Sequence, residues 1–386
     1  MSRARATFAA DMSGLYFHIP FCRSRCAYCA FHSTTRLPMR GAYADAMCRE
    51  MELYRGFDDA DPVRTVYFGG GTPSQMSPEL IARILRKADE TFGLDRVEEI
   101  TLECNPDDLG DEYLSGLEAT PVNRISMGVQ SLDDGTLRTI RRRHTAEGAL
   151  EAIRKSHMHG FDNISADLIY GLPGQSVNDF VSDIRALAAE GVTHLSAYCL
   201  SYEEDTPLFT MMKKGEITQA SDELCAELYH ELCQTMSSLG FIHYEISNFC
   251  KPGFHSRHNS CYWDGTRYLG IGSGAHSFDG KVRRWNIPDI DRYISGMISG
   301  RPSMESETLT EDDRYNEMVM LSLRTGRGIS LGRMSATFGE DAARKFLSDA
   351  GRWIETGDLI HDGDYVRFSE SGLFTGDGIV SRLFRG

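Results

Sequence analysis

Short apolar runs and longer amphipathic segments alternate along the first two thirds of the chain. Residues 77–93 and 221–240 have apolar positions at helical spacing, and each segment begins at a serine that can cap a helix and ends at a glycine. Apolar and β-branched runs of strand length lie at 15–19, 65–69, 99–103, 124–128, 164–170 and 194–200. Repeated strand–helix units predict parallel strands covered by helices, and hence a full or partial (β/α) barrel.

The pattern changes after about residue 300. Helical segments there are followed by a short hairpin that turns at 362–364 and by a final helix, as is typical of a small winged-helix-like α+β module. We therefore predict two domains, a barrel at 1–290 and a module at 300–386. Winged helices often bind DNA, but the acidic balance of this chain favours a packing or lid role.

Composition excludes several classes of function. The 386 residues carry a net charge of −15, so no nucleic-acid or anionic-membrane surface is expected. No apolar stretch reaches the roughly 18 residues of a membrane span, and no apolar signal segment follows the first residues. We predict a cytoplasmic protein, and the sequence leaves its oligomeric state and any association with membrane-bound partners open.

Unusual residues follow the predicted strands. The segments HIPFC, GGGTPS, ECNPDD, GVQS and GLPGQ come at the ends of the first five. Each segment alone is compatible with ordinary turn chemistry. Because (β/α) barrels place their chemistry at the C-terminal ends of the strands, the five together predict a site on one rim.

Three of the cysteines lie close together, Cys22, Cys26 and Cys29, in a C-x3-C-x2-C pattern. The others are isolated, as is typical of small buried side chains. With His32 as a fourth ligand, the three thiolates would complete a closed zinc site. Without it, they suit a [4Fe–4S] cluster that keeps one iron open. The glycine-rich segment at 69–73 favours the cluster, because glycine lets a ligand approach the backbone.

These motifs together resemble the radical S-adenosylmethionine (SAM) superfamily. The segments YFHIPFCRSRCAYCAF, YFGGGTPS, ECNPDD, RISMGVQS, ADLIYGLPGQ and RHNSCYW are similar to those of the group that contains coproporphyrinogen dehydrogenase and the HemW heme chaperones. The resemblance runs from residue 16 to residue 263. It implies a partial (β/α) barrel of radical SAM type, in which SAM binds the open iron of a [4Fe–4S] cluster.

The resemblance also implies roles for individual residues. It makes Cys22, Cys26 and Cys29 the cluster ligands. It places a further set of residues around SAM and the cluster: Tyr16, Tyr28, Gly70, Gly71, Thr72, Glu103, Gln130, Arg142 and Asp167. The last three match residues that hold a second SAM in coproporphyrinogen dehydrogenase. By residue type alone, Tyr16 is equally typical of a strand core, and Arg142 belongs to a run of arginines that suits a solvated helix face.

Two departures favour a heme chaperone over the dehydrogenase. Phe31 stands where the dehydrogenase has a further cysteine, and the first predicted strand starts near residue 15, without the long preceding segment of that enzyme. The segment HNSCYW at 258–263 matches an H-N-x-x-Y-W motif of HemW-like chains. There His258 would offer an imidazole to heme iron, and the two aromatic residues a flat apolar surface. The alternative for His258 is a hydrogen-bonded core histidine.

The sequence thus predicts a protein that binds heme and delivers it to apo-hemoproteins such as respiratory enzymes. Its expected cofactors are a [4Fe–4S] cluster, SAM and heme, and an electron donor is an expected partner. The alternative is an enzyme, an oxygen-independent coproporphyrinogen III dehydrogenase that acts on propionate side chains. A SAM-dependent heme-cleaving methyltransferase shares the scaffold but has no specific support in this sequence.

Overall fold

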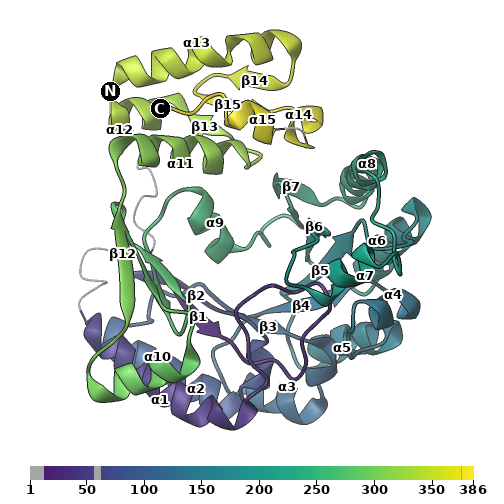
Figure 1. The fold of residues 1–386 in the computed structure, drawn as a ribbon, viewed down its shortest axis with the longest axis vertical. Helices are drawn as coiled ribbons and strands as arrows, with labels where there is room; N and C mark the ends of the chain where they lie inside the picture. Colours follow the sequence, from purple (N-terminus) through teal and green to yellow (C-terminus); the bar gives the residue numbers. More distant parts are fainter. Residues whose placement is uncertain (1–12, 56–61, 375) are drawn as a thin grey trace.

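The computed structural model describes residues 13–55, 62–374 and 376–386. It shows a curved sheet with helices along its outer side, and a smaller unit that faces its open side (Figure 1). Six parallel strands form the centre of the sheet: β1 (Ser13–Ile19), β2 (Val63–Gly70), β3 (Glu99–Cys104), β4 (Arg124–Gln130), β5 (Ile164–Tyr170) and β6 (His194–Cys199). These are the six strands that the sequence predicts.

Helices follow each of these six strands, and most of them cover the convex face of the sheet. They are α1 (Arg40–Leu53), α2 (Pro78–Phe92), α3 (Asp111–Glu118), α4 (Asp134–Thr139), α5 (Ala146–Met158), α6 (Val177–Ala189), α7 (Pro207–Lys213) and α8 (Asp222–Ser238). Both predicted helices are present. Ser221 caps α8 by accepting a hydrogen bond from the Leu224 N–H at 3.2 Å. Ser77 precedes α2, but its side chain makes no capping hydrogen bond there.

The large sheet continues on both sides of these six strands, and the strand next to β1 is also parallel to it. Next to β1 lie β9 (Tyr268–Ile271), β10 (His276–Phe278), β11 (Val282–Asn286) and β12 (Met304–Thr308). Next to β6 lie β8 (Asn248–Cys250) and β7 (Ile242–Glu245). The order is β12-β11-β10-β9-β1-β2-β3-β4-β5-β6-β8-β7, so among the described strands β12 and β7 are the two edges. The sheet is therefore a partial barrel.

Alternation along the strands separates an apolar face from a polar one. Leu15, Phe17 and Ile19 of β1 are fully buried in the core beneath the helices. Tyr16 and His18 point to the opposite, concave face, because successive side chains alternate. The same alternation lines that face with polar residues of the other strands: Thr65, Tyr67, Glu99, Thr101, Glu103, Arg124, Ser126, Ser165, Asp167, His194 and Ser196. The concave face is thus suited to a polar ligand.

The C-terminal module has its own hydrophobic core, which includes Val319, Phe346 and Val366. It contains α11 (Glu311–Leu323), β13 (Ile329–Ser330), α12 (Leu331–Phe338), α13 (Glu340–Thr356), β14 (Leu359–Asp362), β15 (Tyr365–Phe368), α14 (Glu370–Phe374) and α15 (Asp377–Val380). The predicted hairpin is the β14–β15 pair. Because β12 pairs with β11 in the large sheet, we draw the boundary after residue 308 and not at residue 300.

Two helices complete the barrel domain. α10 (Ile290–Ser299) packs on α1, and α9 (Arg257–Trp263) lies between the large sheet and the module (Figure 1). In the part of the chain that the structure describes, no helix combines the length and hydropathy of a membrane span.

Candidate cofactor site

The loop that follows β1 carries the three clustered cysteines. The Ala27 N–H donates a hydrogen bond to the Ile140 carbonyl at 2.9 Å, which ties the loop to the chain beyond β4. Cys22 is buried, whereas Cys26 and Cys29 are half-buried, and all three are free thiols. The loop therefore presents three sulfur atoms at the C-terminal ends of the strands.

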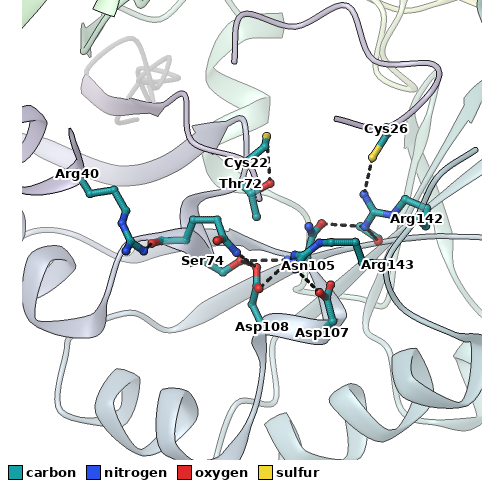
Figure 2. Close-up of polar contacts among 12 residues, drawn as sticks. Cys22, Cys26, Arg40, Thr72, Ser74, Asn105, Asp107, Asp108, Arg142 and Arg143 are labelled. Atoms are coloured by element: carbon teal, nitrogen blue, oxygen red, sulfur yellow. Dashed lines mark hydrogen bonds and ion pairs between the residues drawn. The ribbon is translucent and has the colours of Figure 1, made fainter. Parts of the chain in front are cut away.

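Two of these sulfurs accept hydrogen bonds, one from a residue just after β2 and one from the segment between α4 and α5, as Figure 2 shows. Thr72 Oγ1 donates to Cys22 Sγ at 3.4 Å, and Arg142 Nη1 donates to Cys26 Sγ at 3.3 Å. Burial raises the pKa of the Cys22 and Cys29 thiols, and the Thr72 hydrogen bond opposes this shift at Cys22. Since a thiolate is the form that binds a metal, iron has to displace these protons on binding.

Arg142 joins the cysteine loop to two strand ends. Its Nη2 donates to Asn105 Oδ1, just after β3, at 2.8 Å, and also to the Gly128 carbonyl of β4. Together with the bond to Cys26, these contacts fix the guanidinium in one plane beneath the loop (Figure 2).

The neighbouring residues Arg141 and Arg143 do not contact the cysteines. Arg143 pairs with Asp107 at 2.6 Å and with Asp108 at 3.2 Å. Arg141 is exposed. The interpretation as a solvated arginine therefore holds for Arg141, whereas Arg142 is the member of the run that reaches the cysteines.

The glycine run after β2 passes directly over β1. A Cβ atom on Gly71 would lie 2.8 Å from the carbonyl carbon of Pro20. Gly70 has a φ of 111°, and a Cβ atom there would lie 2.5 Å from the ring of His18. Both positions therefore require glycine, because neighbouring protein atoms occupy the space that a side chain would need.

Glu103 places a carboxylate beside the glycine run. Tyr67 donates its hydroxyl hydrogen to Oε1 at 2.7 Å, and the Gly70 N–H donates to Oε2 at 3.1 Å. Burial raises the pKa of Glu103 to about 7, and the Tyr67 hydrogen bond is the main opposing influence. A ligand with an amino group would find a carboxylate acceptor here beside the glycine run.

Gln130 and Asp167 approach the same place from β4 and β5. The pairing of these strands is irregular between Gly128 and Gln130, and Gln130 has a φ of 69°. A Cβ atom on Gly128 would lie 2.9 Å from Gln130 Nε2 and 3.3 Å from Arg142 Nη2, so the two side chains meet above this glycine. Burial raises the pKa of Asp167 to about 6, and a hydrogen bond from Ser196 opposes the shift most strongly.

The two predicted aromatic residues lie in different surroundings. Tyr28 packs against Ile140 and Ile169 beside the cysteine loop, and burial raises its pKa. Tyr16 lies on the concave face, where its hydroxyl is 3.0 Å from His18 Nδ1. Its ring stacks on Tyr67, with ring centres 6.2 Å apart.

The donor set fits a cluster better than it fits zinc. His32, the fourth ligand of the zinc alternative, has its Nε2 3.1 Å from Ser273 Oγ. Among the residues that the structure describes, no three His, Cys, Asp or Glu side chains gather around a single metal position. A [4Fe–4S] cluster distributes its thiolates over different irons and accepts hydrogen bonds on sulfur. Three thiols with two sulfur-directed donors match that chemistry.

His258 lies apart from the cysteines, on α9. Its side chain is buried, with Nδ1 2.9 Å from Thr65 Oγ1 near the start of β2 and Nε2 3.0 Å from the Tyr262 hydroxyl. Its backbone N–H donates to Glu99 Oε1 at 3.0 Å. Burial lowers the pKa of His258 to about 3, so the ring is neutral at physiological pH. Both ring nitrogens are thus engaged within the protein.

Sequence reasoning missed residues that complete the site. Asn105 orients Arg142, and Tyr67 orients Glu103. The alternation along β2 puts Tyr67 on the concave face and is a signal that could have found it. Arg124 is 1% exposed on that face, and within the described residues its Nε has no hydrogen-bond partner. No local pattern marks it.

Comparison with known proteins identifies the class of this chain. A model of the radical SAM superfamily matches residues 16–187, and a model of the HemN C-terminal domain matches residues 309–375. The solved structure of coproporphyrinogen III oxidase (HemN) from Escherichia coli superposes with a TM-score of 0.82 over 97% of this chain and 90% of that one, at 22% identity. The chain is thus a radical SAM protein with a HemN-type fold, and its class implies SAM and a [4Fe–4S] cluster as cofactors.

Full-length relatives narrow the class to one family. Heme chaperone HemW of Mycobacterium tuberculosis is 35% identical over 96% of this chain and 94% of its own length. The proteins of the same name from Bacillus subtilis and Lactococcus lactis are 33% and 32% identical, and each match covers 95% of this chain and at least 96% of the relative. The chain therefore belongs to the HemW family.

Proposed function

We propose that this protein binds heme and delivers it to apo-hemoproteins such as respiratory enzymes. The observation that carries the proposal is its similarity to heme chaperones along nearly the whole chain. Phe31 supports it, because a 73% exposed phenyl ring occupies the position where the dehydrogenase has a further cysteine. The dehydrogenase activity is accordingly the second candidate.

We propose Cys22, Cys26 and Cys29 as the ligands of the cluster, which when bound supplies one iron that no cysteine ligates. The hydroxyl of Thr72 and the guanidinium of Arg142 support this proposal, because each donates a hydrogen bond to a cysteine sulfur. Such donors stabilise negative charge on thiolates and hold them in orientation.

SAM would bind where the glycine run and the strand ends meet. Gly70 and Gly71 let this strand end pack closely on the end of β1, and the Glu103 carboxylate beside them is an acceptor for an amino group. The full proposed set is Tyr16, Tyr28, Gly70, Gly71, Thr72, Glu103, Gln130, Arg142 and Asp167. Its members come from strands β1 to β5, from the cysteine loop and, for Arg142, from the segment between α4 and α5.

We further propose His258 as a ligand of heme iron. The support is a neutral imidazole whose orientation is set by Thr65 at Nδ1. Coordination through Nε2 would replace the hydrogen bond to the Tyr262 hydroxyl. Binding at this nitrogen therefore requires Tyr262 to move aside.

One experiment separates chaperone from enzyme. The iron-reconstituted protein is titrated anaerobically with heme, and the same sample is then given coproporphyrinogen, SAM and a reductant for product analysis. We expect a saturable one-to-one heme spectrum and no porphyrin conversion. Formation of protoporphyrinogen with release of 5′-deoxyadenosine would replace the chaperone proposal by the enzyme.

Histidine variants locate the iron ligand. His258→Ala is expected to lose or shift the heme spectrum, whereas His361→Ala, an exposed residue of β14, is expected to retain it. The cluster absorption of each variant shows whether the barrel is still folded. An unchanged heme spectrum in a folded His258→Ala protein would exclude His258 as the ligand. The electron donor, the association with membrane-bound partners and the cytoplasmic location stay predictions.

A further inference from the structure

A cavity of about 340 Å³ lies where the barrel domain meets the C-terminal module. The barrel contributes Tyr262 and Trp263 of α9 and Tyr268 of β9, and the module contributes Met318 of α11 and Phe338 of α12. The volume falls within the range of roughly 300–1,000 Å³ that is typical of small-molecule sites. Aromatic walls of this kind suit a flat apolar ligand.

Direct contacts between the two units hold the walls together. Arg283 of β11 pairs with Glu317 of α11 at 2.6 Å. The Arg333 guanidinium of α12 donates a hydrogen bond to the Asp264 carbonyl, just after α9. Because each unit supplies one wall, neither unit forms this cavity alone.

The cavity lining contains three arginines, Arg283, Arg314 and Arg333, and two carboxylates, Asp264 and Glu317, although the chain as a whole carries −15. Arg283 and Arg333 are engaged in the contacts just described. In the described part of the chain the Arg314 guanidinium has no hydrogen bond or ion pair, and its Nε is buried. A buried N–H group without a partner is destabilising, so the position favours an anionic ligand group.

We propose that this cavity is the porphyrin site and that Arg314 binds a propionate carboxylate of the porphyrin. The inference rests on the heme-binding function proposed above, and it adds a location and an anchoring residue. A guanidinium matches a carboxylate with two parallel hydrogen bonds, which fixes the ring edge as well as adding affinity.

The side chain of Tyr262 lies between the cavity and His258, the proposed iron ligand. The ring of Tyr262 lines the cavity, while its hydroxyl lies 3.0 Å from His258 Nε2. A rotation of Tyr262 would therefore let His258 Nε2 reach the iron of a porphyrin that packs against Trp263. This geometry explains how a fully buried histidine can serve a ligand that enters between the two units.

The test compares two ligands and two arginine variants of the full-length protein. Heme and heme dimethyl ester, which lacks the carboxylate charges, are titrated into wild type, Arg314→Met and Arg344→Met. Arg344 is exposed on α13 and serves as the matched control. We expect Arg314→Met to bind heme about ten- to a hundredfold more weakly and to bind the ester as wild type does. Arg344→Met should bind both ligands as wild type does.

A second pair of variants tests the location of the porphyrin site with substitutions that leave the charge of the protein unchanged. Thr337 lines the cavity from α12 and is exposed, so Thr337→Trp places an indole in the cavity without disturbing the core. We expect it to weaken binding of heme and of the ester alike by about tenfold or more. Ala336→Trp, an exposed neighbour on the same helix that does not line the cavity, should have no such effect.

The outcomes separate the inference from the function on which it rests. If wild type binds heme but neither Arg314→Met nor Thr337→Trp weakens it, the cavity is not the site and the chaperone proposal stands. If only Thr337→Trp weakens binding, the location stands and the carboxylate anchor is wrong. If Arg314→Met loses SAM binding instead, the carboxylate belongs to SAM and the inference falls. If wild type shows no saturable heme binding, both the proposed function and the inference are wrong.

Discussion

The cysteine rim and the cavity between the two units are assembled in different ways. The rim collects side chains from neighbouring strand ends of one sheet, and hydrogen bonds such as that between Arg142 and Asn105 lock them together. The cavity collects side chains from two units that each have a separate core. Strand topology alone positions the rim, whereas the cavity depends on how the module docks. The rim is therefore expected to tolerate changes at the docking surface, and the cavity is not.

The largest expected effect lies at the rim. Cys26→Ala removes the sulfur that accepts the Arg142 hydrogen bond and one of three proposed iron ligands. We expect loss of the broad visible absorption after iron reconstitution, while Cys48→Ala, a half-buried residue of α1, keeps it. Iron and zinc analysis completes the measurement. A full cluster spectrum in Cys26→Ala would contradict the ligand assignment.

A smaller effect is expected at Arg142. Arg142→Met deletes the donors to Cys26, Asn105 and Gly128, so it loosens the contact between the cysteine loop and the strand ends. We expect SAM affinity of the reconstituted protein to fall about tenfold or more, as measured by equilibrium binding. Heme affinity should not change. A parallel loss of heme affinity would show that rim and cavity are coupled.

Arg143→Met is the matched control for Arg142. Arg143 pairs with Asp107 and Asp108 and makes no contact with sulfur. Its replacement should leave SAM affinity within about threefold of wild type, since partly exposed ion pairs contribute little. Equal losses in the two variants would mean that charge at this rim, and not the Arg142 hydrogen bonds, sustains SAM binding.

A pH dependence is expected from the scaffold that rim and cavity share. Glu50 of α1 accepts hydrogen bonds from the Gly272 N–H after β9, from Asn286 and from Tyr293. Burial raises its pKa from 4.5 to about 7. Between these values the folded protein holds a proton that the unfolded chain has lost, so stability falls as pH rises and levels off above about pH 7. The expected change is about 3 kcal/mol.

Glu50→Gln should make this slope shallower, and the raised pKa values of Glu103 and Asp167 should sustain what is left of it. The measurement is the urea midpoint of unfolding between about pH 5 and about pH 8. Glu52→Gln, an exposed neighbour on the same helix, should keep the slope of wild type. A slope as steep as that of wild type in Glu50→Gln would show that Glu50 does not contribute to the pH dependence.

The smallest effect is expected at Phe31, the residue that distinguishes this motif from that of the dehydrogenase. Because its side chain is 73% exposed, Phe31→Ala should change stability by no more than about 0.5 kcal/mol and leave the iron content unchanged. Iron analysis and thermal unfolding test this. A loss of iron would show that the phenyl ring shields the cluster.

The fold and the rim could be predicted further than the cavity could. Short apolar and β-branched runs located six of the seven parallel strands, and strand-end motifs then named residues that the barrel brings together. The strands β7 to β12 were not predicted, because β7 to β10 have only three or four residues and β11 and β12 are mostly polar. The hydrogen bond between Arg142 and Asn105 was not predicted either, since it depends on how the segments after β3 and β4 fold.

The cavity left almost no trace in the sequence. Trp263 belongs to a contiguous motif, but Arg314 and Thr337 lie on helices of another unit, where their spacing is ordinary. For His258 the sequence left two interpretations open, a heme ligand and a hydrogen-bonded core histidine, and the structure buries the ring with both nitrogens hydrogen-bonded. Contacts between units follow from docking, which no local pattern encodes.

At Gln130, the backbone conformation and the proposed role of the side chain in ligand binding favour different residues. Its φ of 69° lies in the left-handed region, where a residue with a side chain is destabilised by about 1–2 kcal/mol relative to the ordinary conformations. Glycine would relieve this strain, but it would also delete the amide that meets Arg142 above Gly128. If Gln130 binds SAM as proposed, a stabilising glycine at this position would weaken SAM binding, so stability and the proposed function favour different residues here.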